Sequence, residues 1–191
     1  MASLDEQAAA SIAFIRHTMA RSASFTAVPG RGGIAMGIVG VAAAVIARRQ
    51  PDATSWLWTW LAAAVVAVPV GFASMIVKAR RHGVTLLSPA GRRFAQGFLP
   101  AILVAAVLTG MLVRARAFAF LPPLWLLLYG AGVMAGGSAS VALLAWIGVA
   151  FIACGIAAAL TPVAWSDVWL GTGFGVVQIV SGVIIARKHG G

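Results

Sequence analysis

The chain has 191 residues, of which 61% are hydrophobic and only 9% are charged, and 14 basic residues against four acidic ones give it a net charge of +10. Soluble globular domains carry about 25% charged residues, so this composition excludes a soluble enzyme and predicts an integral membrane protein. The basic residues border apolar runs and form no nucleic-acid-binding motif, so we expect no nucleic-acid partner.

Residues 1–32 are predicted to form an amphipathic helix and a turn. Ser3 and Glu6 have the spacing of a capping box. A helix over about 4–24 would gather apolar side chains on one face: Ala8, Ile12, Ile15, Met19 and Ala23. We expect it to lie in the membrane interface, although a surface helix packed on the bundle fits equally well. Pro29 and the glycines after it predict the turn into the membrane.

Five runs contain no Asp, Glu, Lys or Arg: 32–47, 53–77, 94–113, 117–166 and 168–186. About 20 apolar residues cross a bilayer as a helix, so the fourth run must hold two spans, with a turn at the small, flexible segment 136–140. We therefore expect an all-α membrane domain over residues 33–191 with six transmembrane helices. Their expected positions are about 33–48, 56–77, 96–113, 119–137, 141–161 and 168–186, which makes the first and third spans short.

Basic residues are distributed unequally between the two sides of the membrane. With the N-terminus in the cytoplasm, ten lie inside and four lie outside, namely Arg48, Arg49, Arg114 and Arg116. Cytoplasmic segments carry an excess of Lys and Arg, so we expect both termini to be cytoplasmic. We interpret the run of Trp56, Trp58 and Trp60 as an aromatic belt rather than a ligand cage. Six tryptophans in all fall at the outer ends of the spans: Trp56, Trp58, Trp60, Trp125, Trp165 and Trp169.

The segment after the second span concentrates five cationic residues: Lys78, Arg80, Arg81, Arg92 and Arg93. Each basic residue near an anionic leaflet contributes about 1 kcal/mol of attraction. We therefore predict that these five residues bind anionic lipid headgroups.

Glycines recur at helical spacing on the first span, at Gly33, Gly37 and Gly40, and on the sixth, at Gly171, Gly175 and Gly182. Such small-residue faces let helices approach closely in lipid, so we predict that they form seams inside the bundle. Gln178 shares the face of the sixth span, and Tyr129 lies on a similar stripe of the fourth.

Tyr129 and Gln178 are the most polar groups near mid-membrane, so they are the candidate site residues within the spans. We predict that they face one another and either hydrogen-bond a small uncharged ligand or line a narrow path. The spans contain no buried acid for proton coupling, no metal-ligand motif, no haem His pair and no Ser–His pair, so we expect neither a cofactor nor an enzymatic activity.

Three segments resemble a group of small bacterial multi-pass membrane proteins without an assigned activity: 25–30 (FTAVPG), 125–130 (WLLLYG) and 185–191 (IARKHGG). The resemblance implies a location in the bacterial inner membrane.

We predict a non-enzymatic membrane component, such as a sensor, accessory or assembly subunit, in contact with anionic lipids and with a second copy or another membrane protein. The alternative is a small channel or facilitator for an uncharged or weakly polar solute. Residues 33–113 and 119–186 would then form two three-span halves of opposite orientation, as in transporters with inverted repeats. A lipid-modifying membrane enzyme ranks third.

Overall fold

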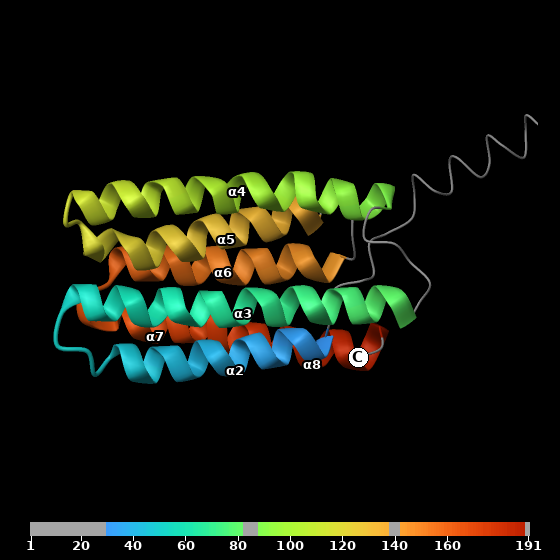
Figure 1. Ribbon diagram of the computed structural model, residues 1–191, viewed down its shortest axis with the longest axis horizontal. Helices are drawn as coiled ribbons and strands as arrows, with labels where there is room; N and C mark the ends of the chain where they lie inside the picture. The colour runs from blue at the N-terminus through green and yellow to red at the C-terminus, as the bar shows by residue number, and fades with distance from the viewer. Residues whose placement is uncertain (1–29, 82–87, 138–141, 190–191) are drawn as a thin grey trace, which may run out of the picture.

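The computed structural model describes residues 30–81, 88–137 and 142–189, so the predicted N-terminal helix lies outside the described residues. In these ranges the chain is helical, and six helices are long and apolar enough to cross a membrane, as expected (Figure 1). The first five spans are α2 (Gly30–Ala47), α3 (Ala53–Arg81), α4 (Pro89–Arg114), α5 (Leu121–Gly137) and α6 (Ala142–Leu160). The sixth consists of α7 (Ser166–Leu170), the π-helical segment η3 (Gly171–Val177) and α8 (Gln178–His189). The 3-10 turns Phe118–Phe120 and Val163–Trp165 precede α5 and α7.

The predicted turn between the fourth and fifth spans is in the right place, because α5 ends at Gly137 and α6 begins at Ala142. The prediction of a short third span is wrong, since α4 has 26 residues. It begins at Pro89, where the Ser88 hydroxyl accepts a hydrogen bond from the Gly91 amide at 3.2 Å. The helix thus starts before the charge-free run does, and its first turns carry arginines into the interface.

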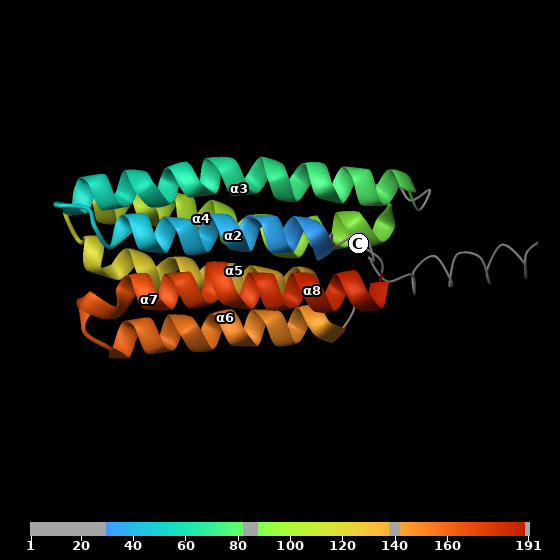
Figure 2. The same cartoon turned by 90° about the horizontal axis from the view of Figure 1, so that it is seen from below.

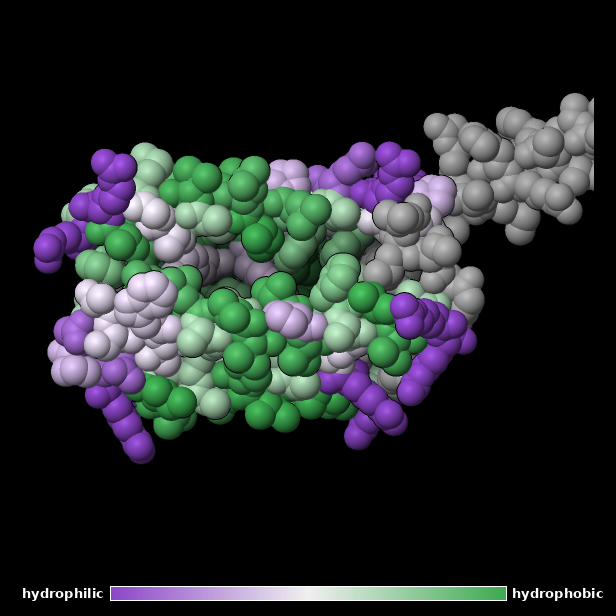
Figure 3. All heavy atoms as spheres, viewed as in Figure 1, coloured by the Kyte–Doolittle hydropathy of each residue, from purple (hydrophilic) through white to green (hydrophobic). Residues whose placement is uncertain are grey.

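Large apolar side chains are exposed around the middle of the bundle. Val65 of α3 is 73% exposed and Leu103 of α4 is 66% exposed. Figure 3 shows this apolar belt with hydrophilic residues gathered at both ends. A surface of this kind is stable in lipid and would aggregate in water. The end that holds Trp56, Trp125 and Trp169 is called the tryptophan end, and the end that holds Lys78 and the arginines around it is called the basic end.

The helices pack in the order α4, α5, α6, sixth span, α2, α3. This row curves, so that α3 and α4 come to lie toward the same face (Figures 1 and 2). Figure 3 shows that this face is hollowed between them, and we call this region the side hollow. In the second three-span half the last two spans pack together, whereas α3 packs chiefly on α2 and α4 on α5. The first two spans pack together in both halves, α2 on α3 and α5 on α6, so the packing repeats only in part.

The predicted glycine seam joins α2 to the sixth span. A Cβ at Gly33 would lie 3.2 Å from Gly182 Cα, and one at Gly40 would collide with the Phe174 carbonyl. The backbones of the two spans are thus in direct contact, as the small-residue faces indicated.

The seam yields a stability prediction for Gly175→Leu. A Cβ at Gly175 would lie 2.6 Å from Val41 Cγ2 and 3.2 Å from Val41 N, so α2 must move to admit the side chain. We expect a loss of about 1 to 3 kcal/mol, the usual scale of overpacking, in detergent unfolding. The matched control is Gly110→Leu on α4, because no described atom lies within 4 Å of a Cβ there. Equal stability of the two variants would contradict the packing described here.

Candidate functional site

The predicted mid-membrane pair is formed. The side-chain amide Nε2 of Gln178 donates to the Tyr129 hydroxyl at 3.4 Å and lies 4.0 Å from Met36 Sδ. The pair joins the first residue of α8 to the middle of α5, and α2 contributes the thioether. Since the Tyr129 oxygen accepts from Gln178, the phenolic hydrogen can be donated to a ligand oxygen.

Aromatic rings surround Tyr129. Its ring centroid lies 4.6 Å from that of Phe151, 5.1 Å from Phe174 and 5.7 Å from Phe98. Phe151 is fully buried, whereas Tyr129, Phe98 and Phe174 are partly exposed and pack against the core from its edge. This cluster combines rings from α4, α5, α6 and η3, so it lies among the first four helices of the curved row.

The π-helical segment η3 places Phe174 in this cluster. Gly173 and Gly175 flank Phe174 and have no side chains, and a Cβ on either would clash, with Leu126 and Val41 respectively. The flanking backbone can therefore approach α5 on one side and α2 on the other while the phenylalanine ring points inward. Single turns of π-helix are frequent at functional sites, and this one directly precedes Gln178.

A polar clamp at the tryptophan end was not foreseen from the sequence. Asp167 Oδ1 accepts hydrogen bonds from the indole nitrogens of Trp56 at 2.7 Å and Trp60 at 3.2 Å, which ties α3 to α7. Trp56 also stacks on Trp125 with ring centroids 5.7 Å apart and planes 4° apart. The sequence contained one signal for this clamp: residues 56 and 60 are spaced so that they share a helix face.

The aromatic-belt interpretation is therefore only partly correct. Trp58 and Trp165 are 65% and 53% exposed, as expected of a belt, but Trp60 is only 5% exposed. Two further indoles are also hydrogen-bonded, Trp125 to Thr109 of α4 at 2.8 Å and Trp169 to Thr161, just after the end of α6, at 2.9 Å.

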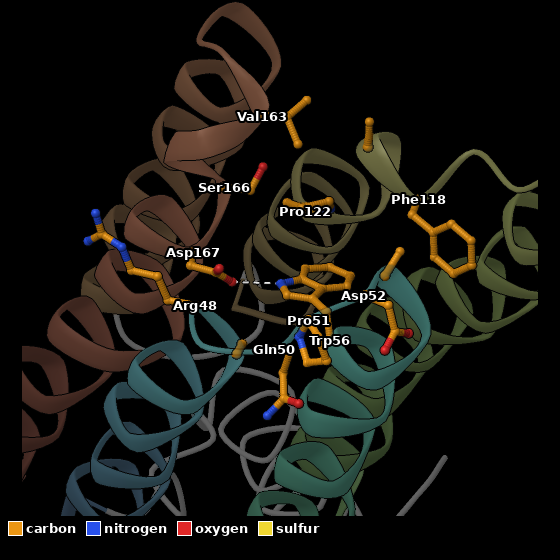
Figure 4. A pocket seen from close by; sticks show the side chains of 13 residues that line it. Arg48, Gln50, Pro51, Asp52, Trp56, Phe118, Pro122, Val163, Ser166 and Asp167 are labelled. Carbon is orange, nitrogen blue, oxygen red and sulfur yellow. Dashed lines mark hydrogen bonds between the residues drawn. The ribbon is translucent and has the colours of Figure 1, made fainter.

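A cavity of about 340 Å³ opens beside the clamp (Figure 4). Its polar lining includes Arg48, Asp52, Ser166 and Asp167. The Ser55 amide and hydroxyl, with the Thr54 amide, donate to the Asp52 carboxylate and lower its pKa. Asp52 therefore caps α3 at neutral pH, and this contribution is lost only as the pH falls through that lowered pKa.

The five predicted lipid-binding residues do not form one cluster. Lys78 and Arg81 line a cavity of about 260 Å³ at the basic end, together with Arg31, which was not among the candidates. Arg80, Arg92 and Arg93 are exposed outside its described lining. Arg31 was missed because 47 residues separate it from Lys78, and only the packing of α2 on α3 brings the two together.

Within the described ranges, the His, Cys, Asp and Glu side chains form no group of three that could hold a metal ion. No family model, curated protein or solved structure matches the chain. The resemblance to small bacterial membrane proteins therefore stays a prediction.

The clamp yields a prediction for Asp167→Ala. Removing the carboxylate leaves two indole N–H groups without their acceptor, and hydrogen bonds to charged groups contribute about 1.5 to 3 kcal/mol. Because Asp167 is partly exposed, we expect a loss near the lower value, about 1.5 kcal/mol, measured by unfolding in detergent with tryptophan fluorescence as the signal. Asp167→Asn keeps an acceptor oxygen and should lose less. If the alanine variant is as stable as the wild type, Asp167 does not hold α3.

Proposed function

We propose that the protein is a non-enzymatic component of the bacterial inner membrane, of the sensor or accessory type, that binds a weakly polar molecule taken up from the bilayer. The observation that carries this proposal is the Tyr129–Gln178 hydrogen bond among partly exposed aromatic rings. The side hollow supports it, since it lies in the apolar belt between the two hydrophilic ends (Figure 3).

The chemistry of the site indicates the class of ligand. Tyr129 and Gln178 offer hydrogen-bond donors to an oxygen acceptor, and Phe98 and Phe174 offer ring faces and edges. A ligand with a flat apolar body and a carbonyl or hydroxyl oxygen fits this combination. Small-molecule sites usually combine an apolar lining with a few placed polar groups in this way.

Permeation of a small solute is the second candidate, because it also needs Tyr129 and Gln178 to face one another. The packed rings weigh against it. Phe151 and Phe174 lie 5.3 Å apart between the cavities at the two ends, and Tyr129 packs on both. A path along the bundle would require these rings to move.

Assembly through the glycine faces receives less support. The glycines of α2 and of the sixth span lie against each other inside the bundle, so a partner protein would have to use other surfaces. The apolar faces of α3 and α4 are available for that purpose, since only 11% and 0% of their most apolar stretches are buried inside the bundle.

Ligand retention tests the proposal. Protein extracted in mild detergent should carry an apolar molecule that is not a phospholipid, detected by mass spectrometry of the denatured sample. Gln178→Leu should lower stability by only about 0.6 kcal/mol, the average for an interhelical hydrogen bond in a membrane. Gln178→Leu and Tyr129→Phe, tested as single variants, should each reduce ligand retention several-fold. The control is Leu160→Ala, which changes an 81% exposed side chain on α6. Identical retention in all four proteins would refute the proposal.

The proposed orientation is tested by cysteine labelling in a Cys154→Ala background. The ten-to-four distribution of basic residues predicts that the basic end is cytoplasmic. An impermeant maleimide added to spheroplasts should therefore label Gln50→Cys at the tryptophan end and should label Ser88→Cys only after lysis. The opposite pattern would reverse the topology.

A further inference from the structure

The cavity at the basic end brings three cationic side chains together from two helices. Arg31 comes from the first turn of α2, and Lys78 and Arg81 come from the last turns of α3. Arg31 and Arg81 are exposed, whereas Lys78 is only 4% exposed. Ala73 and Val77 supply an apolar wall that continues toward the middle of α3.

The charges of this cavity favour an anion. Three cations around one small space repel one another, and a bound anion would offset that repulsion. Both acidic residues in the described ranges, Asp52 and Asp167, line the cavity at the opposite end of the bundle. The Ser74 hydroxyl donates to the Val70 carbonyl at 2.7 Å, so among the lining side chains the three cationic groups are the ones suited to contact an anion.

The residue types indicate which anion fits. Arginine presents a planar fork of N–H donors that matches two oxygens of a phosphate, and lysine adds a compact charge. Basic pockets between transmembrane helices at a membrane surface bind lipid phosphates for these reasons. The apolar wall of Ala73 and Val77 gives an acyl chain a surface beside the phosphate.

We propose that Arg31, Lys78 and Arg81 form a discrete binding site for a phosphate group, supplied by the headgroup of an anionic phospholipid. This site is independent of the ligand proposed at Tyr129. It also narrows the prediction that all five basic residues bind anionic headgroups, because Arg80, Arg92 and Arg93 lie outside the cavity lining.

The test compares two double variants that remove the same charge from the same end. Purified full-length protein is incubated with equal amounts of phosphatidylglycerol and phosphatidylcholine of identical chains, and native mass spectrometry measures the ratio bound. Arg31→Gln with Arg81→Gln should lower the preference for phosphatidylglycerol roughly 10- to 30-fold, since each basic residue contributes about fivefold. Arg80→Gln with Arg92→Gln should change it by less than about threefold. Equal effects of the two pairs, or no effect of either, would overturn the proposal.

Ala73→Phe provides a second test that leaves the charge unchanged. The ring should fill the cavity and lower the preference for phosphatidylglycerol, and this variant decides the question if the double arginine variant does not fold. An unchanged preference in a folded Ala73→Phe protein would overturn the site.

Glycerol 1-phosphate distinguishes the two sources of phosphate. If glycerol 1-phosphate displaces bound phosphatidylglycerol when the two are present at equal concentration, the site binds a soluble phosphate and the lipid assignment is wrong.

Discussion

The close approach of α2 to the sixth span is the contact on which the rest of the bundle depends. Apolar side chains gain nothing by leaving lipid, so helices associate there through packing and hydrogen bonds. Gly33 against Gly182, and Gly40 against the Phe174 carbonyl, bring two backbones together. Because α3 packs chiefly on α2, the position of α2 also determines where α3 lies.

The side hollow follows from how α3 is held. At the tryptophan end its indoles reach Asp167 and Trp125, and at the basic end Ala79 packs beside Ala90 of α4. Between these two attachments α3 packs on α2 and diverges from α4, which packs on α5. The bundle is therefore held at both ends and hollowed in the middle of one face (Figure 3).

Two regions of the molecule thus offer different chemistry to a membrane. The middle presents neutral hydrogen-bond donors and rings, which suit a weakly polar body. The basic end presents three cations around a cavity, which suit a phosphate. Their separation along the bundle matches the layers of a bilayer, whose phosphates lie at the surface and whose apolar molecules lie inside. Neither region needs the other in order to be occupied.

The sequence by itself determined the six spans and the small-residue faces of α2 and the sixth span, and it singled out Tyr129 and Gln178 as the polar groups near mid-membrane. These follow from run length, charge and helical spacing, which are local properties of the chain. The spacing of Trp56 and Trp60 also indicated that they share a helix face, but the sequence did not identify the acceptor of their hydrogen bonds.

Only the tertiary structure decided which helices are neighbours. It joined Asp167 to indoles 111 and 107 residues earlier, and it placed Arg31 beside Lys78. The physical reason lies in the solvent. In water an apolar face marks the inside of a protein, but in lipid the faces toward the membrane and toward the core are equally apolar, so hydrophobic patterning carries no information about which helix packs on which.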